Sequence, residues 1–433
     1  MRWIGGLLLV ALAAPGAAQQ PQQPTVQQLQ VILTDAVRRA LQVQPAMVQA
    51  RGDVRNAGAG MLAANGEFLP SLTTGGSWSR AGGTRLNSVN QIQTLPTNVT
   101  YTGSLSASFD LFTGFRRLAD RRAASATQGA ADAGLVNQRY QVTLQTQQAF
   151  YNALATEELV RVAQAQVART RQELQISVDK LRAGSATRSD SLRSAVDVGN
   201  ARLALLQAQA NLEFAQASLG RQIGVDQPVR AAPDSTLPTL PDTSGLRTQV
   251  VESSPQVLAA DALARAAGAQ VAVSRSAYWP TLTYSASNSF TGASAPWDNT
   301  GAYSKGWNVR MSLSWTLFNG FQRERSLTSA AVARDEAQSR ADDTRRAVNA
   351  SLTQQIAALQ TAFAQLDIAR SNVAATTEDM RVQQERYRVG AATILDLLTS
   401  QANLTQAQVS LVQARFNYLI ARATLEALVG HEL

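Results

Sequence analysis

The strongest constraint on this chain is an internal repeat that runs through most of its 433 residues. Three short segments of the first half return in the second half, 206 or 210 positions later. These pairs are residues 68–73 and 278–283, 111–115 and 317–321, and 181–187 and 387–393. Gly224 and Gly430 keep the spacing of 206. The fold must therefore be built from two similar units, one of which has a loop four residues longer.

The N-terminal residues and a proline-rich stretch complete the division of the chain. A positive start at Arg2, an apolar run of about eleven residues and a small-residue cleavage site predict a signal peptide over residues 1–18. The first repeat then covers residues 19–227, and the second covers residues 246–433. The connector between them, residues 228–245, holds four prolines and is expected to be extended.

Each repeat is expected to open with a helix and to continue with a pair of strands. The helices are expected over residues 34–67 and 249–277, each with a proline near its entry and another after its end. The strands are expected over residues 69–80, 101–111, 281–291 and 307–317, with polar loops at residues 82–98 and 292–304. In the second strand of each pair, apolar and small polar side chains alternate. This alternation predicts one apolar face and one polar face.

Two environments produce such strands, a soluble β-sandwich and a membrane barrel with a watery lumen. The polar loops and the small polar side chains of one face favour the barrel. We find no run of about 18 apolar residues after the signal peptide, so no helix is expected to cross a membrane. Residence in a membrane would therefore require the strands.

After each strand pair, the sequence allows a helix of unusual length. Residues 321–389 contain neither Pro nor Gly, so a helix over residues 322–388 would be on the order of 100 Å long. Apolar residues recur in it at spacings of four and three, which is typical of a coiled-coil seam. They are Leu352, Ile356, Leu359, Phe363 and Leu366. Each long helix is expected to fold back at a glycine, which gives two antiparallel hairpins with tips at residues 182–187 and 388–393.

Composition excludes several classes of function. Cysteine is absent and His431 is the single histidine, so thiolate or multi-histidine metal sites, disulfide scaffolds and catalytic triads are excluded. A carboxylate pair such as Glu157 and Glu158 is more typical of a solvated helix face than of an acid–base site. The net charge of +8 is dispersed among acidic neighbours, unlike the basic patch of a nucleic-acid-binding protein. No enzymatic activity, metal, cofactor or nucleic-acid partner is expected.

Taken together, these features resemble the TolC family of Gram-negative outer-membrane efflux channels. The segments that carry the resemblance most specifically are residues 387–398, 414–419 and 428–430. The resemblance implies a mixed fold, in which a membrane β-barrel with four strands per chain continues into a long α-helical barrel. It also implies a homotrimer, whose three chains would pool twelve strands in outer-membrane lipid and extend a helical tunnel into the periplasm.

The same resemblance implies a function. It is the exit channel of a tripartite efflux or type I secretion system, opened at its periplasmic end by an adaptor and an inner-membrane pump. A soluble periplasmic coiled-coil adaptor or scaffold stays open as an alternative. That alternative accounts for the signal peptide and the hairpins, but it leaves the apolar strand faces exposed.

Near the hairpin tips, the resemblance implies roles for three residues. Asp396 corresponds to a pore constriction, where three nearby copies would raise one another's pKa and favour cations. Alternatively, Asp396 only stabilises the start of a helix. Asp190 and Tyr387 correspond to a latch of the closed state, although Tyr387 could simply cap the hydrophobic end of its hairpin. The family's second constriction carboxylate is replaced by Thr399, and the arginine of its other latch is replaced by Ala392.

The hairpin tips themselves resemble the family's contact points for the periplasmic adaptor. Small residues would allow the tips to pack closely against another hairpin, whereas a plain tight turn would need only the glycine. The residues concerned are Arg182, Gly184, Ser185, Ala186 and Thr187 in the first tip, and Arg388, Gly390, Ala391, Ala392 and Thr393 in the second.

Overall fold

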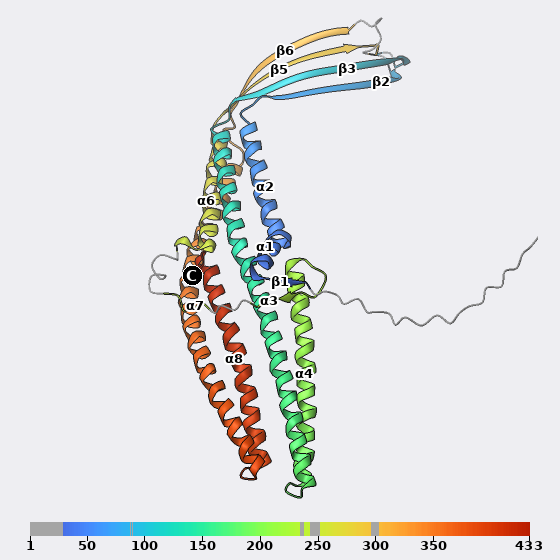
Figure 1. The fold of residues 1–433 in the computed structure, drawn as a ribbon. Coiled ribbons are helices and arrows are strands. Elements are labelled where there is room, and N and C mark those ends of the chain that lie inside the picture. The colour runs from blue at the N-terminus through green and yellow to red at the C-terminus, as the bar shows by residue number, and fades with distance from the viewer. Residues whose placement is uncertain (1–28, 87, 89, 234–237, 243–251, 296–302) are drawn as a thin grey trace, which may run out of the picture.

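The computed structural model describes residues 29–86, 88, 90–233, 238–242, 252–295 and 303–433. The predicted signal peptide, residues 1–18, lies outside the described residues, as do parts of the connector and of the loop expected at residues 292–304. Figure 1 shows one β-sheet at one end of the molecule and two helical hairpin tips at the other.

The same order of elements occurs twice along the chain. The first set is β1 (Gln30–Val31), α1 (Leu33–Val43), α2 (Pro45–Gly66), β2 (Ser71–Leu86), β3 (Ile92–Phe112), α3 (Arg116–Arg182), α4 (Arg188–Ile223) and β4 (Arg230–Ala231). The second set is α6 (Pro255–Arg275), the short 3-10 helix η1 (Ser276–Tyr278), β5 (Thr281–Gly292), β6 (Tyr303–Ser314), α7 (Gln322–Val389) and α8 (Ile394–Val429). The short strands β1 and β4 pair in parallel near the middle of the molecule (Figure 1).

The prediction of one helix over residues 34–67 is wrong, because this segment forms two helices. α1 ends at Val43 and α2 begins at Pro45, with Gln44 between them in an extended conformation at ψ 130°. Proline at the start of a helix has no N–H to lose, but it disfavours the helical conformation for the residue before it. The break at Gln44 follows from this restriction.

The sheet is antiparallel throughout, in the order β2-β3-β5-β6. β2 has 16 residues and β3 has 21, so the polar loop expected at residues 82–98 is mostly strand. Threonine and valine in this region suit an extended backbone. β2 ends at Leu86 and β3 begins at Ile92. β2 and β6 form the two outer edges of the sheet.

The register of the sheet separates a mainly apolar face from a polar one, with Asn288 and Lys305 as polar residues on the apolar side. Ala107 of β3 lies opposite Ala286 of β5, which in turn lies opposite Val309 of β6. The apolar face includes Leu72, Trp78, Tyr101, Leu105, Leu282, Tyr284, Trp307, Val309, Met311 and Leu313. The other face includes Ser71, Thr73, Thr102, Ser104, Ser106, Thr283, Ser285, Ser287, Asn308 and Ser312. The predicted division into an apolar and a hydroxyl-rich face is confirmed.

The two longest helices connect the sheet to the hairpin tips. α3 has 67 residues and α7 has 68, so each is on the order of 100 Å long. Nearer the sheet, α3 packs against α2 and α6; nearer the tips, it packs against α4 (Figure 1). α7 packs in the same way against α6 and then α8.

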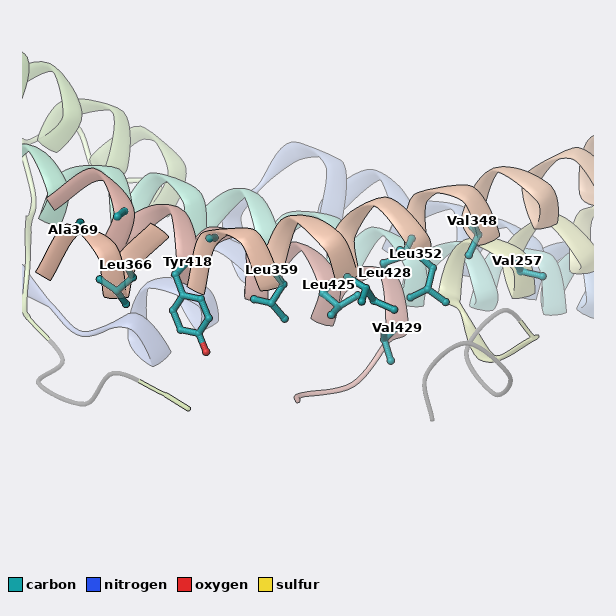
Figure 2. Close-up of a cluster of buried hydrophobic side chains, with 13 residues drawn as sticks. Val257, Val348, Leu352, Leu359, Leu366, Ala369, Tyr418, Leu425, Leu428 and Val429 are labelled. Carbon is teal, nitrogen blue, oxygen red and sulfur yellow. The ribbon is translucent and has the colours of Figure 1, made fainter. Parts of the chain in front are cut away.

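The predicted coiled-coil seam forms the largest core cluster. Leu352, Ile356, Leu359 and Leu366 of α7 are buried against α8, and Phe363 packs beside them. Figure 2 shows Leu359 of α7 together with Tyr418 and Leu425 of α8 in this cluster. The seam therefore continues along both helices of the second hairpin.

α6 differs from the expectation that no later segment is apolar enough to cross a membrane. By length and composition, the segment Pro255–Tyr278 is long and apolar enough to cross a membrane. Much of this hydropathy comes from alanine, and the helix packs against α3 and α7. Its Asp261 forms an ion pair with Arg345 of α7 at 3.0 Å. These contacts assign α6 to the helical bundle.

Candidate functional site

Both strand-to-helix connections make the same left-handed turn. Phe115 before α3 and Phe321 before α7 have φ angles of 66° and 62°, and each follows a glycine that is also left-handed. Such angles are rare for a bulky side chain. The ring of Phe115 packs edge-on against Phe112, and Phe321 packs in the same way against Phe318, with centroids 5.3 and 5.4 Å apart. The recurrence of this turn indicates that it sets the angle between the sheet and the helices.

One arginine supports each of these turns. Arg117 donates to a backbone carbonyl just after α2 at 3.1 Å, and its guanidinium lies 5.0 Å from the centroid of the Phe109 ring. Arg323, which is 206 positions later, donates to the carbonyl of Thr316 at 2.8 Å and lies 4.9 Å from the Tyr278 ring centroid. Each arginine thereby joins the end of a strand to the helix before the strand pair.

Large apolar side chains surround these turns and are exposed in the single chain. They are Phe68, Phe115, Trp279, Trp315, Phe318 and Phe321. Aromatic side chains gather in this way where a barrel meets the edge of a membrane. The turns therefore lie at the boundary between the sheet and the helical part of the molecule.

At the opposite end, both hairpins turn with the same capping arrangement. Thr187 accepts a hydrogen bond from the backbone N–H of Asp190 at 3.2 Å, and the Asp190 carboxylate accepts from the Thr187 N–H at 2.9 Å. Thr393 and Asp396 repeat both bonds with the same distances. Reciprocal caps of this kind satisfy N–H groups that have no partner within the helix. The cap explains why both hairpins turn and restart at the same sequence position.

The Asp396 carboxylate is exposed and bound to its own helix start. Besides the backbone bond, it accepts from the Thr393 hydroxyl at 2.7 Å. These hydrogen bonds from Thr393 hold the pKa of Asp396 below its usual range. The helix-start role is thus visible in one chain, whereas mutual repulsion in a ring requires three chains and stays a prediction.

Tyr387 is buried at the second tip, and no hydrogen bond joins it to Asp190. In the described part of the chain its hydroxyl has no hydrogen-bond partner, and the Asp190 carboxylate is engaged by Thr187. Burial raises the pKa of the Tyr387 phenol, the neighbouring Ser177 hydroxyl opposes this rise, and the nearby charge of Asp190 adds to it. The ring belongs to an apolar cluster with Met380, Ile394 and other residues of its hairpin, as in the alternative role. The latch role stays a prediction.

The tip residues themselves are mostly open to solvent. Gly184 and Gly390 have φ angles of 72° and 84°, which a residue with a side chain rarely adopts. Arg182 and Arg388 form ion pairs with carboxylates three residues earlier, at 3.5 and 2.9 Å. Ser185, Thr187, Ala391 and Thr393 are exposed, while Ala186 and Ala392 are partly buried.

A buried polar group between the hairpins was not predicted from the sequence. Glu173 of α3 is 1% exposed and lies near Gln401 of α8, which is also buried. The signal was present, because Thr170, Glu173 and Ser177 continue the spacing of three and four that Ala163 and Val167 begin. A carboxylate in a coiled-coil stripe marks a site that sequence reasoning can find.

Metal ligands are not gathered anywhere in the described residues, which contain no group of three or more His, Cys, Asp or Glu side chains able to hold an ion. The described polar sites are instead helix caps, ion pairs and the buried group around Glu173.

Comparison with known proteins agrees with this architecture. The sequence pattern of the outer membrane efflux protein family matches residues 36–225 and 246–431. The chain is 25% identical to the outer membrane efflux protein BepC of Brucella suis, over 91% of this chain and 84% of BepC. It is 26% identical to the antibiotic efflux pump outer membrane protein ArpC of Pseudomonas putida, over 99% and 93% of the two chains.

The fold has solved counterparts as well. The crystal structure of CusC superposes with a TM-score of 0.80 over 92% of each chain, at 18% identity. Both halves of the chain match the family pattern, so the match covers each repeat with its strand pair and hairpin. The chain therefore belongs to the outer membrane efflux protein family, and its place is the outer membrane, with the helical hairpins in the periplasm.

Proposed function

We propose that three copies of this chain form the outer-membrane exit duct of a tripartite efflux or type I secretion system. The duct is a passive conduit, and its periplasmic end opens when an adaptor and an inner-membrane pump engage the tips. Residues 1–18 direct export, and residues 19–227 and 246–433 are two structural repeats joined by residues 228–245. The chain carries no enzymatic activity and needs no cofactor.

The open edges of the sheet are the observation that carries this proposal. β2 and β6 end the sheet on either side, and unpaired strand edges are not tolerated in lipid. If β6 of one copy pairs with β2 of the next, the sheet closes into a barrel. The apolar face then meets lipid, and the serine and threonine face lines the lumen. The number three comes from the resemblance to TolC.

A second line of support is an exposed apolar stripe on α4. The stripe consists of Leu192, Val196, Leu203, Leu206 and Phe214. Leu192 and Leu206 stand 206 positions before Leu398 and Val412 of α8.

The α8 counterparts show what such a stripe can pack against. Val412 packs into the core cluster of the first hairpin, which includes Phe150 of α3, and Leu398 packs in a cluster that Ile176 of α3 also joins. α4 would therefore pack on α7 of a neighbouring copy as α8 packs on α3 within the chain. Val382 of α7, the counterpart of Ile176, is likewise exposed.

Membrane fractionation with a mass measurement tests the proposal. The full-length protein, expressed in a Gram-negative host, should appear in the outer-membrane fraction and be extracted by detergent as a particle of three chains. Recovery as a soluble periplasmic monomer would contradict the proposal and would favour a scaffold instead.

Asp396→Asn tests the pore constriction. Asparagine keeps a side-chain oxygen that can accept from Thr393 but removes the charge, so helix capping should survive while cation selectivity should fall severalfold. The measurement is the reversal potential of single channels in a salt gradient, with thermal unfolding as the check on folding. Glu378→Gln, which neutralises an exposed carboxylate of α7, is the matched control. Unchanged selectivity in Asp396→Asn would leave Asp396 only its capping role.

Tyr387→Phe tests the latch. To accept a hydrogen bond from Tyr387, Asp190 has to give up part of its bonding to Thr187, so the net contribution should be small, about 1 kcal/mol. Loss of the hydroxyl should then raise the ratio of open to closed channels roughly fivefold. Single-channel recordings measure this ratio directly. The same open fraction in the variant as in the wild type would rule out the latch.

A further inference from the structure

The contact between the two hairpins of one chain changes character along its length. Toward the middle of the molecule, Val412, Phe416 and Leu419 of α8 pack into the apolar core of the first hairpin. Nearer the tips, an apolar cluster that includes Leu397 and Leu404 of α8 is joined by several buried polar residues. These polar residues are Thr170, Glu173 and Ser177 of α3, Ser194 of α4, and Ser400 and Gln401 of α8.

Polar contacts join the hairpins in this region. The Arg169 guanidinium of α3 donates to the Thr405 hydroxyl at 3.4 Å and to the Gln408 side-chain oxygen at 3.3 Å, both on α8. With its amide nitrogen turned toward Glu173, Gln401 donates to a Glu173 oxygen at 3.2 Å. On the α7 side, the Lys180 ammonium donates to the Tyr387 carbonyl and lies 4.0 Å from the Tyr387 ring centroid.

These contacts leave several buried groups unsatisfied. Within the described residues, Arg169 Nε and Asp197 Oδ2 are buried and have no hydrogen-bond partner, and Ser177 Oγ and Tyr387 Oη have no partner besides their weak interaction with each other. A buried polar group without a partner costs about 1 to 3 kcal/mol. These groups therefore weaken the hairpin contact near the tips.

Glu173 is the group whose charge this environment tolerates least. Its carboxylate is 1% exposed. The charged and titratable groups around it are Arg169 of its own helix, Asp197 of α4, and Tyr387 of α7. From α8 it meets the neutral Gln401. Burial raises the pKa of Glu173 to about 7, Arg169 opposes this rise, and Asp197 adds to it.

We propose that Glu173 is a proton-binding group that sets how firmly the two hairpins of one chain hold together near their tips. With a proton, its carboxyl stays buried between α3, α4 and α8; without one, its charge favours separation of the hairpins. Its functional meaning rests on the proposed function, because separation of the tips would widen the periplasmic entrance only if the chain forms a duct.

The direction of the pH effect follows from the raised pKa. A carboxyl whose pKa is about 7 when packed and 4.5 when solvated binds its proton more tightly in the packed state. The contact is therefore firmest below about pH 4.5, weakens as the pH rises, and is weakest above about pH 7. Over that window the equilibrium between packed and separated hairpins should change on the order of a hundredfold.

The distance between the tips of one chain tests the proposal. Because the chain has no cysteine, spin labels on Ser185→Cys and Ala391→Cys report one distance per chain when labelled protein is diluted with unlabelled protein. Pulsed electron resonance at pH 5.5, at pH 8.5 and at steps between them should give a longer, broader distance at pH 8.5, with a midpoint below about pH 7. The readout needs no conductance, so it keeps its meaning even if the protein proves not to be a channel.

Three variants separate Glu173 from other groups. Glu173→Gln should keep the short distance at both pH values. Asp197→Asn should lower the midpoint by about one pH unit, because it removes a nearby negative charge. Glu385→Gln changes an exposed carboxylate that pairs with Arg388 and should behave as the wild type. A wild-type distance that does not depend on pH, an unaltered pH response in Glu173→Gln, or an unchanged midpoint in Asp197→Asn would each overturn the proposal.

Discussion

Replacing Leu192 and Leu206 together with glutamate is expected to abolish assembly while leaving the single chain folded. Both side chains lie on the exposed stripe of α4, at 58% and 63% exposure. In the assembled duct each would be buried against α7 of the neighbouring copy, where a buried leucine contributes about 2 kcal/mol. A glutamate in the same place would also bury an unpaired charge. Native mass measurement in detergent should therefore find one chain in place of three.

Matched substitutions elsewhere on α4 provide the control. Asn200 and Asn211 are also exposed on α4, on the flank of the helix beside the apolar stripe. The double variant Asn200→Glu and Asn211→Glu adds the same two charges to the same helix and should still assemble. Helical circular dichroism should be equal in both double variants. If the leucine variant assembled as well as the asparagine variant, the stripe would not be a contact between copies.

Tyr418→Ala is expected to be the most destabilising single change in the hairpin core. Tyr418 is fully buried on α8, its ring lies 5.5 Å from that of Phe363, and its hydroxyl donates to the Pro238 carbonyl at 3.1 Å. Removing a large buried side chain leaves a cavity and costs about 3 to 5 kcal/mol. The connector would also lose its hydrogen bond to α8. Denaturant unfolding followed by helical circular dichroism measures the loss.

Tyr418→Phe separates packing from hydrogen bonding. It keeps the ring against Phe363 and removes only the bond to Pro238, which should cost about 1 kcal/mol. The account predicts that Tyr418→Ala is several times more costly than Tyr418→Phe. Equal losses in the two variants would mean that the ring contributes little and that the connector carries the effect.

Regular features of the fold could be predicted because they depend on local periodicity. The long helix expected over residues 322–388 is α7, Gln322–Val389, because nothing within it interrupts a helix. The alternating strands are present for the same reason, and the register places alike residues on one face.

The predicted helix and strand boundaries are wrong where local sequence preferences conflict with one another. Gln44 ends a helix that the apolar pattern alone would continue, because Pro45 follows it. Residues 82–98 combine glycine and proline with threonine and valine. The turn residues suggested a loop, whereas cross-strand pairing extends β2 and β3 through most of the segment. Hairpin pairing between residues only 6 to 12 positions apart, such as Leu86 with Ile92 and Gly83 with Leu95, decides this case, and it outweighs the turn preference of the glycine and proline residues.

At the tips, residue positions could be predicted more completely than interactions. Thr393 and Asp396 lie where the hairpin restarts, as expected, and the structure adds the reciprocal hydrogen bonds. Asp190 and Tyr387 are close enough for the Asp190 charge to raise the pKa of Tyr387, but they share no hydrogen bond. The buried neighbours of Glu173 come from α3, α4 and α8 together. This cluster depends on how two hairpins pack, which no spacing within one helix specifies.

The central claim is that this chain forms a conducting duct, and planar-bilayer recording of the purified particle tests it most directly. The account predicts discrete, cation-selective conductance steps from a preparation whose mass is that of three chains, with the selectivity reduced in Asp396→Asn. The account would be contradicted if a particle of three chains inserted into the bilayer and gave no conductance, both as the wild type and as Tyr387→Phe.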